Sequence, residues 1–167
     1  VFTDAVITGA VIGTATLRGF TAEQFYQTAS YKNRQLGIQA LGGNDLRGWD
    51  FSNQSMAGSS FAGSILDGAD FTDAIVGNAN FSESNLTAEQ FYSTADYKSG
   101  VLDGIQLGRA DYSGWDFAGK SLVGAWISEA DLNNTSFENA NLMGAYVSNG
   151  QFEETRDVNF RNANMQN

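Results

Sequence analysis

The chain has 167 residues and contains no cysteine, no proline and no histidine. Without cysteine or histidine it has no disulfide framework and no thiolate or imidazole group for catalysis. Basic residues are also scarce: 9 lysines and arginines stand against 19 aspartates and glutamates, which gives a net charge of −10. This balance argues against direct nucleic-acid binding through a basic patch. No apolar run is long enough to span a membrane, so we expect no membrane insertion.

The length predicts one domain spanning residues 1–167. The first residue is valine rather than an initiator methionine, which indicates a processed chain or a fragment of a longer protein. Because processing removes signals and anchors, the sequence leaves both a cytoplasmic and an exported location open.

A bulky apolar residue recurs at every fifth position. Between residues 67 and 81 these are Phe71, Val76 and Phe81, and an alanine stands two places before each. Neither the helical period of 3.6 nor the strand period of 2 gives this spacing. The series has 28 members in four blocks: Phe2, Ile7, Ile12, Leu17; Leu36, Leu41, Leu46, Phe51, Met56, Phe61, Leu66, Phe71, Val76, Phe81, Leu86; Leu102, Leu107, Tyr112, Phe117, Leu122, Ile127, Leu132, Phe137, Leu142, Val147, Phe152; Phe160, Met165.

A five-residue period keeps these residues on one side only if the chain turns a corner in every unit. Four corners close a square coil of about 20 residues, and coils stack at the strand spacing of about 4.8 Å. Glycine, asparagine and aspartate tolerate the backbone angles of such corners. They fill 21 of the 27 positions three places before a central residue. The exceptions are Thr14, Ile38, Glu83, Ser99, Arg109 and Glu129.

The runs GADF at 68–71 and NANL at 139–142 carry the motif A-(D/N)-L-x-x. In this the chain resembles the pentapeptide-repeat family, over 28 units of five residues. The resemblance implies an all-β solenoid, a right-handed quadrilateral parallel β-helix. Since four units close one coil, the 28 units predict about seven coils.

Two segments interrupt the period, at 21–32 and 87–98. Thr21 and Gln24 form a capping-box pattern, and the apolar residues that follow lie on one helical face. We expect an inserted helix of about three turns in each segment. The offset that takes position 21 to position 87 also relates GWDF at 48–51 to GWDF at 114–117. The chain is therefore an internal duplication, with units starting near 21 and 87.

Trp49 and Trp115 occupy positions that are normally small, because that position faces the narrow interior. Each tryptophan follows an inserted helix, which predicts that the helix covers a locally opened coil and packs on the indole. An aromatic ligand pocket is the alternative. The residues expected to make this docking contact are Phe25, Tyr26 and Trp49, and Phe91, Tyr92 and Trp115.

Carboxylates are the only abundant reactive groups. Asp50 and Asp70 are twenty residues apart, as are Asp111 and Asp131, so each pair is expected to lie roughly 5 Å apart on stacked coils. Such pairs suit acid–base catalysis or calcium. However, aspartate before the central residue belongs to the repeat and faces solvent on a convex surface, which lacks a pocket. We therefore predict no catalytic residue, metal site or cofactor.

Four outward-facing apolar residues group on two successive coils. Trp126 and Tyr146 are twenty apart, as are Val123 and Met143. Exposed apolar patches often mark contact sites, so this cluster is a candidate interface with a partner or a second copy. Packing that only stabilises the stacked coils is the alternative.

These features predict a non-enzymatic scaffold or protein–protein interaction module, part of a longer bacterial protein. The resemblance implies a second possibility, because some family members protect or inhibit DNA gyrase by imitating duplex DNA. The net charge of −10 is compatible with that role.

Overall fold

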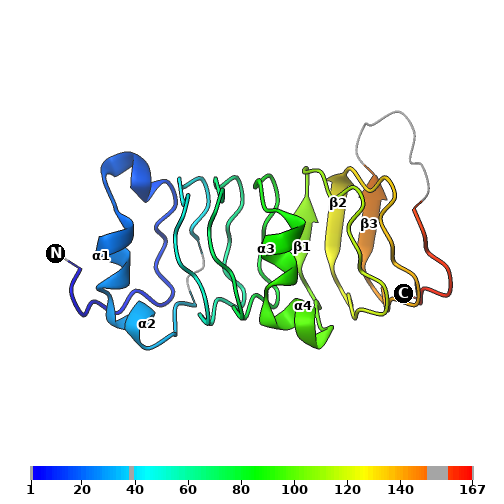
Figure 1. Ribbon diagram of the computed structural model, residues 1–167, viewed down its shortest axis with the longest axis horizontal. Coiled ribbons are helices and arrows are strands. Elements are labelled where there is room, and N and C mark those ends of the chain that lie inside the picture. Colours follow the sequence, from blue (N-terminus) through cyan, green and yellow to red (C-terminus); the bar gives the residue numbers. More distant parts are fainter. Residues whose placement is uncertain (1, 38–39, 150–157, 167) are drawn as a thin grey trace.

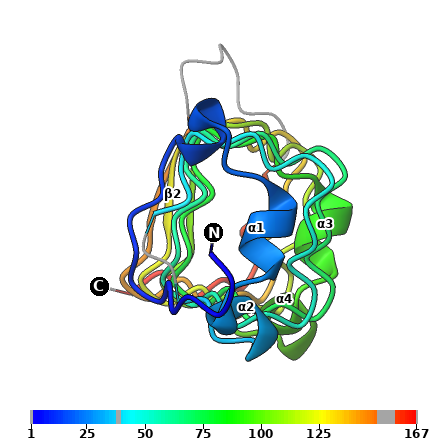
Figure 2. The ribbon, with the colours of Figure 1, turned by 90° about the vertical axis from the view of Figure 1, so that its left-hand side faces the viewer.

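The computed structural model describes residues 2–37, 40–149 and 158–166. Stacked coils form an elongated rod, with the N-terminal coil at one end and the C-terminal coils at the other (Figure 1). Viewed along the rod, the coils trace a four-sided outline around a central core (Figure 2). The protein is a right-handed quadrilateral β-helix, as predicted.

Successive coils pair in parallel at an interval of twenty positions, as in Asp45 with Ile65 and Ser55 with Ile75. Asn80 instead pairs with Gln106, because the inserted helices lengthen that coil. The offset between the two copies therefore equals the length of three regular coils plus the residues that the inserted helices add to this coil. In the described part of the chain, regular strands form on one face only. They are β1 (Gln106–Gly108), β2 (Trp126–Ala130) and β3 (Tyr146–Asn149), in the order β1-β2-β3.

The helices at 22–26 and 88–92 lie on the side of the rod away from β2 (Figure 2). The segment at 21–32 contains two short helices rather than the single three-turn helix expected from the sequence. Thr28 has an extended backbone, and its side chain accepts a hydrogen bond from the Tyr31 N–H, which starts a second helix. Thr94 does the same in the second copy. The helical elements are η1 (Ala15–Arg18), α1 (Ala22–Tyr26), α2 (Ala29–Lys32), α3 (Ala88–Tyr92) and α4 (Ala95–Ser99).

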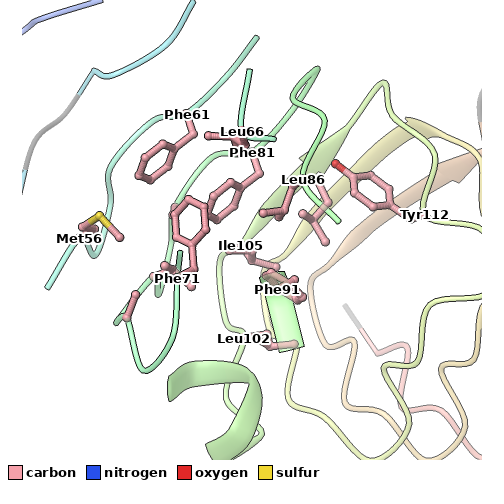
Figure 3. Close-up of a cluster of buried hydrophobic side chains, with 14 of the residues drawn as sticks. Met56, Phe61, Leu66, Phe71, Phe81, Leu86, Phe91, Leu102, Ile105 and Tyr112 are labelled. Atoms are coloured by element: carbon pink, nitrogen blue, oxygen red, sulfur yellow. The ribbon is translucent and has the colours of Figure 1, made fainter. Parts of the chain in front are cut away.

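The core is a column of stacked side chains (Figure 3). Most members of the five-residue series are buried, including Phe71 and Leu132. Rings at equivalent positions of neighbouring coils stack face to face, with centroids 5.2 Å apart for Phe51 and Phe71. Each coil therefore buries its apolar side chains mainly against its two neighbours, as a linear repeat requires.

The series is exposed where no further coil covers it. Phe2 and Met165, near the two ends, are 40% and 57% exposed, which corrects the expectation that they point inward. Leu17 is 79% exposed because η1 carries it out of the ladder. Phe20 packs in its place, with its ring centroid 6.0 Å from that of Trp49. Ile12, Val147 and Phe160 are half-buried, and Phe152 lies outside the described residues.

The corners take a left-handed backbone even where the residue is not glycine. Thr14, Glu83, Arg109 and Glu129, four of the sequence exceptions, all have φ between 51° and 61°. The stacked coils therefore impose this conformation on side chains that ordinarily disfavour it. Of the other exceptions, Ser99 ends α4 and Ile38 lies outside the described residues.

Candidate interaction surfaces

Each inserted helix packs against its tryptophan. The ring centroids of Phe25 and Trp49 lie 5.1 Å apart, and those of Tyr26 and Trp49 lie 6.4 Å apart. In the second copy, Phe91 and Tyr92 lie 5.4 Å and 6.0 Å from Trp115. Both indoles are only 6% exposed. The protein's own aromatic side chains therefore cover the tryptophans.

The helix tyrosines also complete the backbone hydrogen bonding of the next coil. In a regular coil the N–H at this position donates to a carbonyl of the coil below, as Asp70 does to Trp49 at 2.9 Å. The helix removes that carbonyl from below Asp50, and Tyr26 Oη accepts the bond instead at 2.7 Å. Tyr92 Oη accepts from the Asp116 N–H at the same distance. Each hydroxyl thus supplies the acceptor that the regular ladder provides elsewhere, so these hydroxyls are structural.

The carboxylate pairs lie on stacked coils, but each carboxylate is hydrogen-bonded within its own corner. Asp50 pairs with Asp70, and Asp111 with Asp131, on neighbouring coils. Each carboxylate accepts the N–H two residues further on, at 2.8 or 2.9 Å. Hydrogen bonds from the Thr72 side chain and backbone lower the pKa of Asp70. Within the described ranges, no three acidic side chains gather closely enough to hold a metal ion.

Trp126 and Tyr146 form an exposed stacked pair on the face of the rod that carries the regular strands. They are register partners on β2 and β3, with ring centroids 4.5 Å apart and an interplanar angle of 24°. Trp126 is 51% exposed and Tyr146 is 49% exposed. The indole Nε1 of Trp126 donates to Ser128 Oγ at 2.7 Å. If a partner buried the indole ring, the indole N–H would therefore keep its hydrogen bond to Ser128.

Val123 and Met143 lie on the adjacent face, across the corners at Gly124 and Gly144. They are neighbours on stacked coils, where the Gly124 N–H donates to the Met143 carbonyl at 3.0 Å. Met143 is exposed and Val123 is half-buried. The four predicted residues thus lie on either side of one edge of the rod.

The first copy lacks this cluster. At its matched positions, Trp126 and Tyr146 correspond to Ser60 and Asn80, which pair in the same parallel register. Val123 and Met143 correspond to a small residue in each case, Ala57 and Gly77. The fold therefore forms the same face with small and polar residues, and does not require the apolar ones.

An ion-paired arginine beside the stacked pair was not singled out from the sequence as part of a site. Arg109 bonds Glu129 on the next coil at 3.0 Å and Glu83 on the previous coil at 3.0 Å. These residues line a shallow cavity of about 260 Å³ together with Gly108 and Trp126. The contact between Arg109 and Glu129 could have been predicted from the sequence, because they are separated by one regular coil. The helical insertion lies between Glu83 and Arg109, so the spacing of these two residues did not indicate a contact.

The profile of the family described as pentapeptide repeats (8 copies) matches residues 41–73, 64–88 and 121–156. These segments make up half of the chain and contain most of the buried column. The chain belongs to the pentapeptide-repeat family. A search of curated protein sequences found no match. No helix in the described part of this pentapeptide-repeat chain has the length and apolar character needed to cross a bilayer.

Several solved pentapeptide-repeat structures resemble the chain. A protein of the Arabidopsis thaliana thylakoid lumen is 28% identical over 62% of this chain and 65% of its own, with a TM-score of 0.26. Rfr23 of the cyanobacterium Cyanothece 51142 is 19% identical over 70% and 56%, with a TM-score of 0.25. QnrB1, a plasmid-mediated fluoroquinolone resistance protein, is 21% identical over 81% and 71%, with a TM-score of 0.42. The chain thus spans less than two thirds of the length of the first two.

Proposed function

We propose that this pentapeptide-repeat chain is a non-enzymatic scaffold that binds a protein partner through the face holding Trp126 and Tyr146. The observation that carries the proposal is the exposed stacked pair, which is present in one copy of the duplication and absent from the other. Stacked coils form with Ser60 and Asn80 at the matched positions, so stability alone does not account for the aromatics.

The chemistry of the pair suits a protein contact. Tryptophan and tyrosine are enriched among the residues that dominate binding energy at interfaces. The two rings hold each other in a fixed orientation, which reduces the side-chain entropy that a partner must overcome. Met143 adds a flexible apolar side chain across the edge, and such side chains adapt to irregular surfaces.

The test compares partner capture by three forms of the protein. The double variant Trp126→Ser, Tyr146→Asn takes the residues of the first copy and is expected to lose a partner that the wild type retains. Ile75→Ser, which alters another exposed apolar side chain, is the matched control and should retain it. Equal capture by the double variant and the wild type would exclude this face as the contact.

Self-association is a separate outcome of the same variants. If the partner is a second copy, sedimentation velocity will show a dimer of the purified wild type that the double variant does not form. A monomeric wild type that still captures another protein supports the proposal as stated.

DNA mimicry directed at a topoisomerase such as DNA gyrase is the second candidate, and the excess of acidic residues favours it. Ten net charges along a rod of roughly 34 Å give about 0.3 charges per Å, against about 0.6 for duplex DNA. Competition with duplex DNA for purified gyrase tests it. Displacement that weakens steeply with added salt would support mimicry, and no displacement at low salt would exclude it.

A further inference from the structure

The shallow cavity beside Trp126 combines an aromatic ring with charged side chains of both signs. Its volume is about 260 Å³, and its lining residues are Ser82, Glu83, Gln106, Gly108, Arg109, Trp126, Ser128 and Glu129. Most of these residues belong to β1 and β2. The cavity is therefore continuous with the exposed face that holds the stacked pair.

One face of the indole borders this cavity. Tyr146, on the following coil, stacks on the other face with ring centroids 4.5 Å apart. The register neighbour of Trp126 on the preceding coil is Gln106, which is not aromatic. The other lining residues also lie on preceding coils or on β2 itself, so the uncovered face of the indole is the one directed at the cavity. The bond from Nε1 to Ser128 holds the ring in this orientation.

The charged side chains of the cavity favour a cation. Arg109 donates a hydrogen bond to each carboxylate oxygen of Glu129 and one to Oε1 of Glu83. Two carboxylates against one guanidinium leave a single net negative charge. The second oxygen of Glu83, Oε2, has no hydrogen-bond partner among the described residues, and this side chain is about half exposed. The cavity thus offers an accessible anionic acceptor close to an aromatic face.

The first copy keeps the glycine of this cavity. Gly108 corresponds to Gly42, and coil packing accounts for both glycines. A Cβ added to Gly108 would lie 3.1 Å from the Ser128 carbonyl oxygen, and one added to Gly42 would lie 2.8 Å from the Ala62 carbonyl oxygen. The glycine is therefore a requirement of the fold in both copies.

The charged residues, by contrast, occur in the second copy alone. The first-copy corner residues that correspond to Glu83, Arg109 and Glu129 are Thr14, Gly43 and Gly63. All six have φ between 51° and 69°, a region that glycine adopts freely and that other side chains disfavour. Exposed ion pairs contribute little to stability. Stability therefore does not account for Arg109 and Glu129 at corners where glycine fits better.

We propose that this cavity binds the guanidinium of an arginine on the protein partner. The planar cation stacks on the uncovered face of Trp126, and Glu83 Oε2 accepts a hydrogen bond from it. A guanidinium suits the site better than an ammonium, because it is flat, is more weakly hydrated and stacks on aromatic rings. This inference rests on the proposed function, since it names the side chain that enters beside the Trp126–Tyr146 pair.

The probe is N-acetyl-arginine methylamide, and its neutral isostere N-acetyl-citrulline methylamide is the control. Titration into the whole protein at low salt, followed by NMR of the indole N–H signals, should show a saturable shift at Trp126 with a Kd on the order of 10 mM. The signals of Trp49 and Trp115 should not move, because both indoles are buried. No saturation with the arginine compound, or an equal response to the citrulline compound, would overturn the proposal. Tighter binding of N-acetyl-lysine methylamide would contradict the choice of a guanidinium.

Two variants separate the cavity from the general acidity of the chain. Glu83→Gln should raise the Kd of the arginine compound about threefold, as expected for an exposed ion pair. Glu89→Gln, on α3, removes the same charge on the side of the rod away from β2 and should leave the Kd unchanged (Figure 2). Both variants should retain the wild-type circular dichroism. Equal effects of the two changes would show that net charge attracts the cation and would contradict the proposal.

Partner capture distinguishes this inference from the proposed function. Both hold if capture is lost in the double variant Trp126→Ser, Tyr146→Asn and weakened in Glu83→Gln. Loss in the double variant with full capture by Glu83→Gln would leave the proposed function standing and overturn the arginine contact. Full capture by both variants would overturn the proposed function, and with it the partner's arginine as the occupant.

Discussion

Phe25 and Trp49 bury each other: their ring centroids lie 5.1 Å apart, Phe25 is fully buried and Trp49 nearly so. Phe25→Ala should therefore destabilise the protein by about 3–5 kcal/mol, because it leaves a cavity under the indole. Trp49 fluorescence should shift to the red, measured in a background with Trp115→Phe and Trp126→Ser.

Hydrogen exchange provides the control for this variant. Because coils of a linear repeat contact only their neighbours, coils beyond residue 110 should keep their protection while the coil at Trp49 loses it. Uniform loss of protection along the rod would show that the helix does not act locally.

Phe71→Ala tests the buried column itself. Phe71 stacks on Phe51 at 5.2 Å and contacts Phe61 and Phe81 edge-on. The truncation should cost about 3–5 kcal/mol in urea unfolding. Ile75→Ala, four positions later and exposed, should cost less than about 0.5 kcal/mol. Equal effects of the two changes would contradict the assignment of inward and outward positions.

Tyr112 is the one polar side chain of the inward column, and its hydroxyl has no partner among the described residues. Tyr112→Phe should therefore stabilise the protein by about 1 kcal/mol near neutral pH, since a buried unpaired hydroxyl is costly. A loss of stability would indicate that the hydroxyl is bonded within the core.

Burial also raises the pKa of Tyr112 above that of the unfolded chain. A raised folded-state pKa gives stability that is fully present below the unfolded pKa of about 10 and is lost as the pH rises beyond it. Thermal unfolding should therefore show a steep alkaline loss of stability, which is smaller in Tyr112→Phe than in the wild type.

Calcium should not stabilise the protein through its stacked carboxylates. Asp50 and Asp70 each already accept a corner N–H at 2.8 Å, so a metal ion would compete with the hydrogen bonds that shape the turns. Adding calcium at about 5 mM should leave the unfolding temperature equal to that measured with a chelator. Saturable stabilisation at micromolar calcium would contradict this.

The five-residue period predicted the core because each centre, such as Phe71 or Leu132, is buried by equivalent centres one coil away. It failed at Phe2, Leu17 and Met165, where burial depends on a covering coil that the pattern does not specify. Trp49 was predicted to contact its helix because an oversized residue in a small position needs cover. The break at Thr28 was missed, since its capping role competes with an apolar spacing that continues through it.

The candidate surface was less predictable than the core. The spacing of Trp126 and Tyr146 by one regular coil placed them side by side, but did not predict the bond from the Trp126 indole to Ser128.

Site-specific photocrosslinking tests the proposed contact most directly. A benzoylphenylalanine in place of Tyr146 on β3 should crosslink the partner, whereas the same residue in place of Asn80, the matched position of the first copy, should not. Both variants should retain the wild-type circular dichroism. Crosslinking from position 80 but not from 146, or equal yields from the two, would contradict the proposal that this protein binds its partner through the Trp126–Tyr146 face.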